Sequence, residues 1–134
     1  MKPNLSLFTC LLVYSFSYSL IAQPKVENLG NAVNSEFNEI NPVISPDGKT
    51  LFFGRVSHPQ NAHGLEGSQD IWYSELTNNQ WSLAKRMSQP LNKEEYNCAY
   101  SVTPDGNTLL IMGAYDKGAY ETRGFSFSKR TANG

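Results

Sequence analysis

The sequence has few of the features that would crosslink the chain or carry out chemistry directly. It contains only two cysteines, Cys10 and Cys98, and Cys10 lies in an apolar N-terminal stretch. If that stretch is removed, the one remaining thiol excludes an intrachain disulfide, so the domain must be held together by its core. No basic residue or histidine lies near Cys98 in the sequence, and we expect a small buried side chain there rather than a nucleophile.

Charge is also scarce. Asp, Glu, Lys and Arg make up 17% of the residues, and the net charge is −1. Because Lys and Arg are scattered rather than clustered, neither nucleic acid nor an anionic membrane is an expected partner. The chain also lacks a Gly-x-Ser-x-Gly elbow, a P-loop and a nucleotide-binding glycine fingerprint. We therefore expect no enzymatic activity and no cofactor.

Residues 1–22 have the anatomy of a secretory signal peptide. A positively charged start precedes an uncharged run rich in Leu and Phe, and Ala22 comes just before polar sequence. We expect cleavage after Ala22 and export of residues 23–134, with no membrane span, to the periplasm, the outer membrane or the medium. The alternative is an uncleaved anchor, since the run is near the lower limit of ~17 residues for spanning. Lipidation is not expected, because Cys10 lies inside the run instead of closing it.

The rest of the chain is organised around a turn motif that occurs twice. Residues 45–53 read Ser-Pro-Asp-Gly-Lys-Thr-Leu-Phe-Phe, and residues 103–111 read Thr-Pro-Asp-Gly-Asn-Thr-Leu-Leu-Ile, displaced by 103 − 45 = 58 positions. Pro presets the second position of a type I turn, Asp suits the third, and Gly takes the left-handed conformation that follows. The predicted structural turn residues are Pro46, Asp47, Gly48, Pro104, Asp105 and Gly106. Strands on both sides of such a turn form a β-hairpin, and a repeated hairpin indicates stacked equivalent units.

We assign one repeat unit to about residues 26–83 and a second, incomplete unit to 84–134. The ungapped match between the units keeps the turn and also aligns Asn34 with Asn92. The predicted strands are 42–45, 50–55, 70–76 and 81–84 in the first unit, and 100–103, 108–114 and 125–129 in the second. The predicted core is centred on Phe52, Phe53, Trp72 and Trp81. Two longer connections, 56–69 and 115–123, are predicted to be loops that present binding residues.

The turn motif, followed by Asp-Ile-Trp-Tyr at 70–73 and a strand that begins at Trp81, resembles the WD-type β-propeller repeats of the TolB-like family. The resemblance covers about residue 26 to the C-terminus and implies an all-β, incomplete β-propeller of roughly two four-stranded antiparallel blades. It also implies an exported envelope protein. Because a propeller needs ~4–8 blades to close, we expect a fragment of a longer protein or a chain that self-associates through open blade edges.

Two groups of residues are candidates for metal or acid–base chemistry. His58 and His63, with Glu66 and Asp70 nearby, could be read as metal ligands, but a glycine-rich loop lacks the rigid framework of a zinc site. We predict solvated loop histidines and no metal. Asp47 and Asp105 could be read as the paired carboxylates of a glycosidase. Capping of backbone N–H groups in the turn accounts for both aspartates instead.

Tyrosines supply a third candidate site. Tyr73, Tyr96, Tyr115 and Tyr120 can form a surface that contacts sugars or peptides, although tyrosine is also an ordinary strand residue. We expect a non-enzymatic protein-binding or scaffolding surface in the cell envelope, with a protein or an envelope polymer as its partner. One alternative is a fragment of the propeller domain of an exported hydrolase or peptidase. Another is a carbohydrate-binding surface.

Overall fold

The structure is a computed structural model that describes residues 25–132, and this part of the chain contains strands and turns but no helix. The strands are β1 (Asn38–Ile44), β2 (Thr50–Val56), β3 (Gln69–Thr77), β4 (Gln80–Trp81), β5 (Lys85–Arg86), β6 (Ala99–Val102), β7 (Thr108–Asp116) and β8 (Ala119–Lys129). All strand ladders are antiparallel. The predicted all-β class is confirmed for these residues. The predicted signal peptide, residues 1–22, lies outside them.

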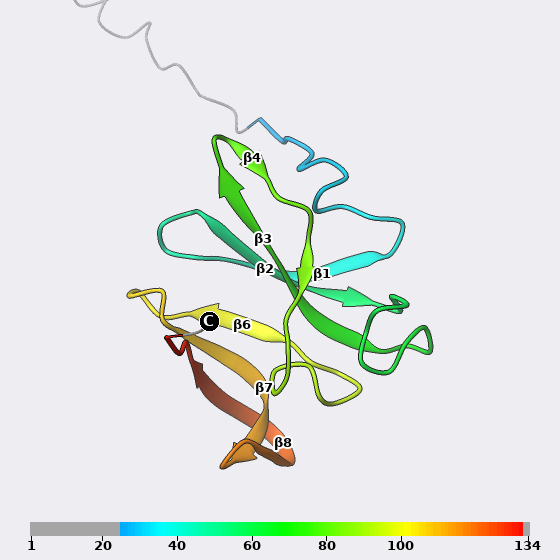
Figure 1. Cartoon of the computed structure of the whole chain (residues 1–134), viewed down its shortest axis with the longest axis vertical. Coiled ribbons are helices and arrows are strands. Elements are labelled where there is room, and N and C mark those ends of the chain that lie inside the picture. The colour runs from blue at the N-terminus through cyan, green and yellow to red at the C-terminus, as the bar shows by residue number, and fades with distance from the viewer. Residues whose placement is uncertain (1–24, 133–134) are drawn as a thin grey trace, which may run out of the picture.

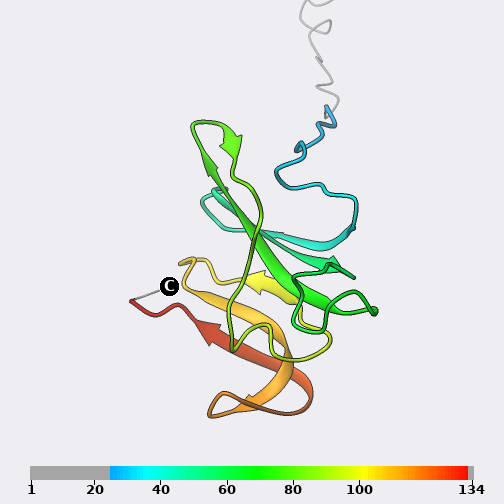
Figure 2. The ribbon, with the colours of Figure 1, turned by 45° about the vertical axis from the view of Figure 1, so that its right-hand side comes forward.

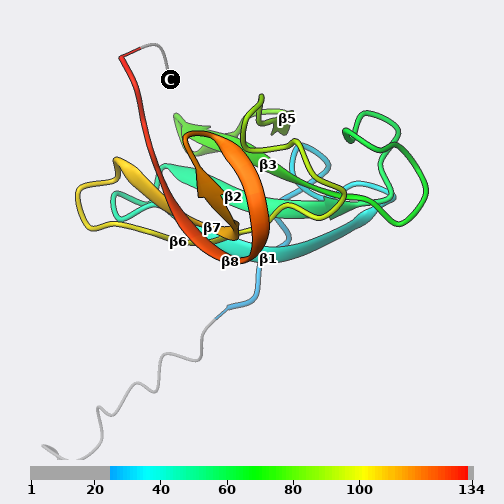
Figure 3. The same cartoon turned by 90° about the horizontal axis from the view of Figure 1, so that it is seen from below.

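The strands form two sheets, which lie one above the other in Figures 1 and 2. The first sheet has the order β1-β2-β3-β4, with β5 also paired to β3, and the second has the order β6-β7-β8. Strands β1 and β6 lie against each other and bring the two sheets together. Figure 3 shows how strongly the β7–β8 ribbon curls. In the described residues, no helix is long and apolar enough to cross a membrane.

Each sheet has two faces, because side chains alternate along a strand. The register of β2 with β3 and of β7 with β8 decides which residues share a face. We term one side of each sheet the front face: Phe52, Ile71 and Tyr73 in the first sheet, and Leu110, Met112, Phe125 and Phe127 in the second. The back faces carry Leu51, Phe53 and Trp72 in the first sheet, and Leu109 and Ile111 in the second.

The core lies between the front face of the first sheet and the back face of the second. Phe52 and Ile71 are buried there with Leu109 and Ile111. Leu91 packs against them from the linker between the sheets, which comprises residues 87–98. The two sheets therefore stack front to back, as repeated units do when they follow one another in the same orientation.

A smaller core covers the back face of the first sheet. Phe53 and Trp72 are buried there beneath Val33, with Trp81 packed at its margin. The predicted burial of Phe52, Phe53 and Trp72 is confirmed, whereas Trp81 is only half-buried.

The two Pro-Asp-Gly turns have nearly the same geometry. In the first, the Ser45 hydroxyl donates to Asp47 Oδ1 at 2.6 Å, and the Lys49 N–H donates to the same oxygen at 3.0 Å. In the second, the Asn107 N–H donates to Asp105 Oδ1 at 3.1 Å. The glycines that follow have φ of 71° and 73°. Hydrogen bonds from Ser45 and Thr103 are the main reason why the pKa values of Asp47 and Asp105 lie below the usual range.

Replacing Ser45 with alanine is expected to raise the pKa of Asp47 toward its ordinary value of ~4, because the variant lacks the hydroxyl donor. Since folding lowers this pKa, the stabilisation from Asp47 is present above the unfolded-state pKa and is lost as the pH falls through the folded-state value. A carboxyl-carbon NMR titration measures the shift directly. The Asp105 signal is the internal control and should not move; an unchanged Asp47 pKa would contradict this account of the turn.

The structure corrects two predicted segments. The predicted strand 81–84 is wrong beyond Trp81: β4 ends there, residues 82–84 are not in a strand, and β5 begins only at Lys85. Strands β4 and β5 pair with different parts of β3. The predicted loop 115–123 is wrong: β7 continues to Asp116 and β8 begins at Ala119, so the connection is a tight hairpin. Lys117 and Gly118 both have positive φ, which is the geometry of the two-residue turns that join antiparallel strands.

Candidate functional site

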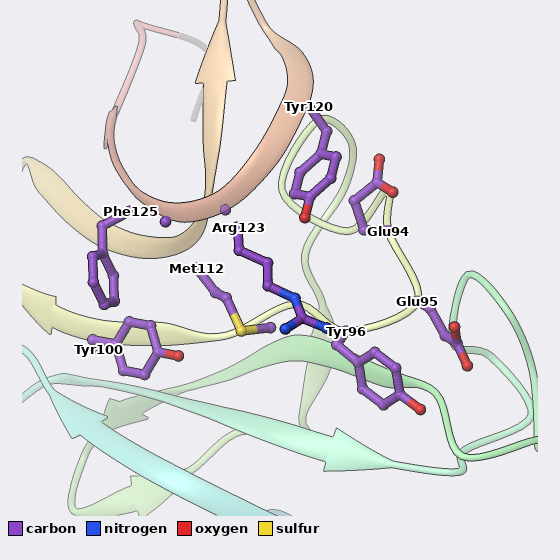
Figure 4. Close-up of a pocket in the computed structure, with 10 residues that line it drawn as sticks. Glu94, Glu95, Tyr96, Tyr100, Met112, Tyr120, Arg123 and Phe125 are labelled. Carbon is purple, nitrogen blue, oxygen red and sulfur yellow. The ribbon is translucent and has the colours of Figure 1, made fainter.

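A cleft of about 560 Å³ lies beside the front face of the second sheet (Figure 4). It is lined by Glu94, Glu95, Tyr96, Tyr100, Met112, Gly113, Tyr120, Arg123, Gly124 and Phe125. The linker between the sheets forms one wall, and strands β6, β7 and β8 form the other. We term this site the aromatic cleft, because three tyrosines and a phenylalanine contribute to it.

The linker wall is held in place by hydrogen bonds to β3. The Gln69 N–H donates to the Glu95 carbonyl at 2.8 Å, and the Asn97 N–H donates to the Gln69 carbonyl at 2.7 Å. Asn97 is itself buried and donates through Nδ2 to Asp70 Oδ1 at 3.0 Å. Asp70 is fully buried and forms an ion pair with Arg86 on β5. The first sheet thus fixes the position of residues that face the second.

The sheet wall depends on two glycines. Gly113 has φ of 98°, and a Cβ at this position would lie 2.7 Å from the Tyr115 ring. Gly124 has φ of 153°, and its Cβ would lie 3.2 Å from that of Ala114. Both glycines occur where the β7–β8 register shifts, so they allow the ribbon to bend around the cleft.

Both aromatic rings and charged groups line the cleft. The Tyr100 and Phe125 rings meet edge to face, with 5.5 Å between their centroids. In Figure 4 the Arg123 side chain extends into the middle of the cleft. Among residues 25–132, no carboxylate lies within ion-pair distance of Arg123. The Glu95 carboxylate raises the pKa of Tyr96, while burial is the main cause of the raised pKa of Tyr100.

The structure brings together only part of the predicted tyrosine surface. Tyr96 and Tyr120 line the aromatic cleft. Tyr73 instead packs against the core between the sheets, and so does Tyr115, whose ring lies 5.6 Å from that of Tyr120. The remaining aromatic and charged residues of the site were not predicted from the sequence: Glu94, Glu95, Tyr100, Arg123 and Phe125. The sequence signal that could have identified this face is the alternation of Phe125, Ser126 and Phe127, which places two aromatic rings on one face of a strand.

The two histidines do not share an environment, and His58 is half-buried rather than fully solvated as predicted. The His58 ring lies edge-on between Phe37 and Trp72, with centroid distances of 4.7 and 4.6 Å. Burial, and then the Arg55 charge, lowers the pKa of His58. His63 is exposed, with Nε2 3.1 Å from the Lys93 carbonyl oxygen. No group of three His, Cys, Asp or Glu in the described part of the chain is arranged to hold a metal ion.

The connection predicted over 56–69 is folded onto the sheet rather than extended from it. Asn61 is buried and donates through Nδ2 to the Arg55 carbonyl at 2.8 Å. Its Oδ1 accepts a 3.0 Å hydrogen bond from Trp72 Nε1. Asn61 therefore anchors this segment beside Trp72, while most of its other residues between 59 and 67 are exposed.

The predicted burial of the Cys98 thiol is confirmed. Its side chain is buried and accepts a hydrogen bond from Asn41 Nδ2, with 3.2 Å between nitrogen and sulfur. Burial raises the pKa of the thiol, so the thiolate is disfavoured.

No protein-family model, curated protein or solved structure matches the chain. The aromatic cleft combines apolar rings with the Arg123 guanidinium, which has no ion-pair partner among residues 25–132. The rings offer apolar contact and the guanidinium can bind an anion, which suits recognition of a ligand.

Proposed function

We propose that this chain is an exported, non-enzymatic segment of β-propeller repeats, similar to the TolB-like type, that binds a protein partner in the cell envelope. The partner would contact the front face of the second sheet and the aromatic cleft beside it. Support for the propeller assignment comes from the front-to-back stacking of two antiparallel sheets whose Pro-Asp-Gly turns repeat. Export is inferred from residues 1–22 alone.

A single observation carries the binding proposal. The second sheet exposes Phe125 and Phe127 on its front face, beside a cleft that contains Arg123, which has no ion-pair partner in the described part of the chain. Contiguous apolar surface rimmed by polar groups is typical of protein interaction sites. Aromatic residues and arginine are also the side chains that most often dominate binding energy in interfaces.

Site-specific photo-crosslinking tests this proposal. A photoactivatable amino acid at position 123, in cells that express the full chain, is expected to give covalent adducts with protein. The matched control is position 130, where the native arginine is exposed at the end of β8 and outside the cleft. Equal adduct formation at the two positions, or adducts at neither, would contradict a protein-binding role for this face.

Carbohydrate binding is the second candidate, because two tyrosines and two carboxylates line the cleft, and Figure 4 shows Tyr120 beside Glu94 and Tyr96 beside Glu95. Tyrosine offers an apolar face to a sugar ring, and a carboxylate accepts hydrogen bonds from sugar hydroxyls. Retention of the chain on immobilised glycans, lost when both tyrosines are replaced by alanine, would favour this function over protein binding.

A further inference from the structure

Equivalent residues on the front faces of the two sheets differ greatly in how far they are exposed. Phe125 follows Ile71 by 125 − 71 = 54 positions, and both face the same way from the third strand of their sheets. Ile71 is 1% exposed because the second sheet covers it, whereas Phe125 is 66% exposed. Phe127, the equivalent of the half-buried Tyr73, is 70% exposed. The second sheet thus presents the kind of face that the first sheet buries.

The other sheet faces in the described residues are already covered. The back face of the second sheet lies against the first sheet. The back face of the first sheet lies beneath Val33, which is 3% exposed, and packs with Trp81 and Ala84. Residues 25–132 therefore leave one open apolar sheet face. In a second copy of the chain, the same residues likewise leave only this sheet face open. Two copies can pair sheet faces only by bringing this same face together.

The charged side chains beside the face include both signs, so the same patch on two copies can attract itself. Arg123 contributes a positive charge, and Glu94 and Glu95 contribute negative charges, from opposite walls of the cleft. Within residues 25–132, neither Arg123 nor either glutamate is in an ion pair. In a two-fold symmetric contact the same patch lies on both copies, so each patch must contain both members of every interacting pair. This patch contains both a positive and a negative charge.

We propose that the front face of the second sheet binds the same face of a second copy, giving a two-fold symmetric dimer. This inference rests on the proposed function, in which the face binds protein, and it names that protein as the chain itself. Phe125 and Phe127 would form the apolar centre. Arg123 of each copy would face the carboxylates of Glu94 and Glu95 in the other copy at the rim.

Sedimentation equilibrium of the chain, as purified from cells that process it, tests the dimer. A monomer–dimer equilibrium is expected, and Arg123→Glu should weaken it at least ~tenfold, because like charges would then meet across the interface. Arg123→Glu combined with Glu94→Arg and Glu95→Arg should restore dimerisation. Arg130→Glu makes the same charge change outside the cleft and should leave the equilibrium unchanged.

Phe125→Thr with Phe127→Thr provides an independent variant. Both side chains are exposed in the monomer, and threonine suits a strand, so circular dichroism should show an intact fold while the dimer is lost. A chain that stays monomeric up to its solubility limit would overturn the dimer. So would a dimer that survives these substitutions, as expected if the β8 edges paired instead. A monomer that still crosslinks to other proteins from position 123 would overturn the dimer but leave the proposed function standing.

Discussion

Replacing Trp72 with alanine is expected to lower the free energy of unfolding by about 3–5 kcal/mol, the usual range for deleting a large buried aromatic side chain. Trp72 is 2% exposed at the centre of the back face of the first sheet. The Arg55 guanidinium lies over its ring, 4.4 Å from the ring centroid. The Trp72 Nε1–H donates a hydrogen bond to Oδ1 of buried Asn61. The truncation leaves a cavity, an unpaired amide oxygen and a buried guanidinium without the nearer of its two aromatic neighbours.

Small domains have a total stability of about 5–15 kcal/mol, so this substitution removes a large part of it. Urea unfolding followed by far-ultraviolet circular dichroism measures the change without relying on tryptophan fluorescence. Trp81 provides a matched control, because it is half-buried at the margin of the same core. Its replacement by alanine should cost about 1 kcal/mol. Similar losses for both tryptophans would contradict the assignment of Trp72 as the centre of this core.

Replacing Asn92 with alanine is expected to lower the free energy of unfolding by about 3 kcal/mol, because it leaves buried backbone groups without partners. Asn92 is fully buried in the linker between the sheets. Its Oδ1 accepts from the Ile71 N–H at 2.7 Å, and its Nδ2 donates to the carbonyls of Ile71 and Met87 at 2.8 Å each. The side chain thus joins the linker to β3 beside the core between the sheets.

The repeat itself supplies the control for Asn92. Asn34 is the residue 58 positions earlier, but it is half-buried, and its side chain donates only to Asn28 Oδ1, at 2.9 Å. Its replacement by alanine should cost under ~1 kcal/mol. Denaturant unfolding of both variants tests whether the buried hydrogen bonds of Asn92 stabilise the fold. Equal losses of unfolding free energy at the two positions would show that these hydrogen bonds are not the cause.

Much of the fold could be predicted because its signals are local. The Pro-Asp-Gly turns fix the hairpins around residues 47 and 105, and their spacing revealed the repeat. Strands β2, β3 and β6 begin and end within one residue of the predicted ranges. The β7–β8 hairpin was missed because its turn is Lys117-Gly118, and lysine is not a residue that normally signals positive φ.

The candidate site could be predicted only in part, because it depends on contacts between distant segments. Tyr96 and Tyr120 were identified as surface tyrosines, but they line the same cleft only because β7 and β8 curl. Arg123 lay inside a predicted loop, which hid its place on a strand beside the cleft. The environment of His58 was misjudged for a similar reason. Its ring packs on Trp72, 14 residues further along the chain.

Both proposals require that the two repeated β-sheets stack front to back and leave the front face of the second sheet open. Methyl NOE spectroscopy of the labelled chain can detect this stacking. Ile71, on the front face of the first sheet, should show cross-peaks to Leu109 or Ile111 and none to Leu110 of the same copy. Cross-peaks to Leu110 in the same copy, or no contact between the sheets, would contradict the claim.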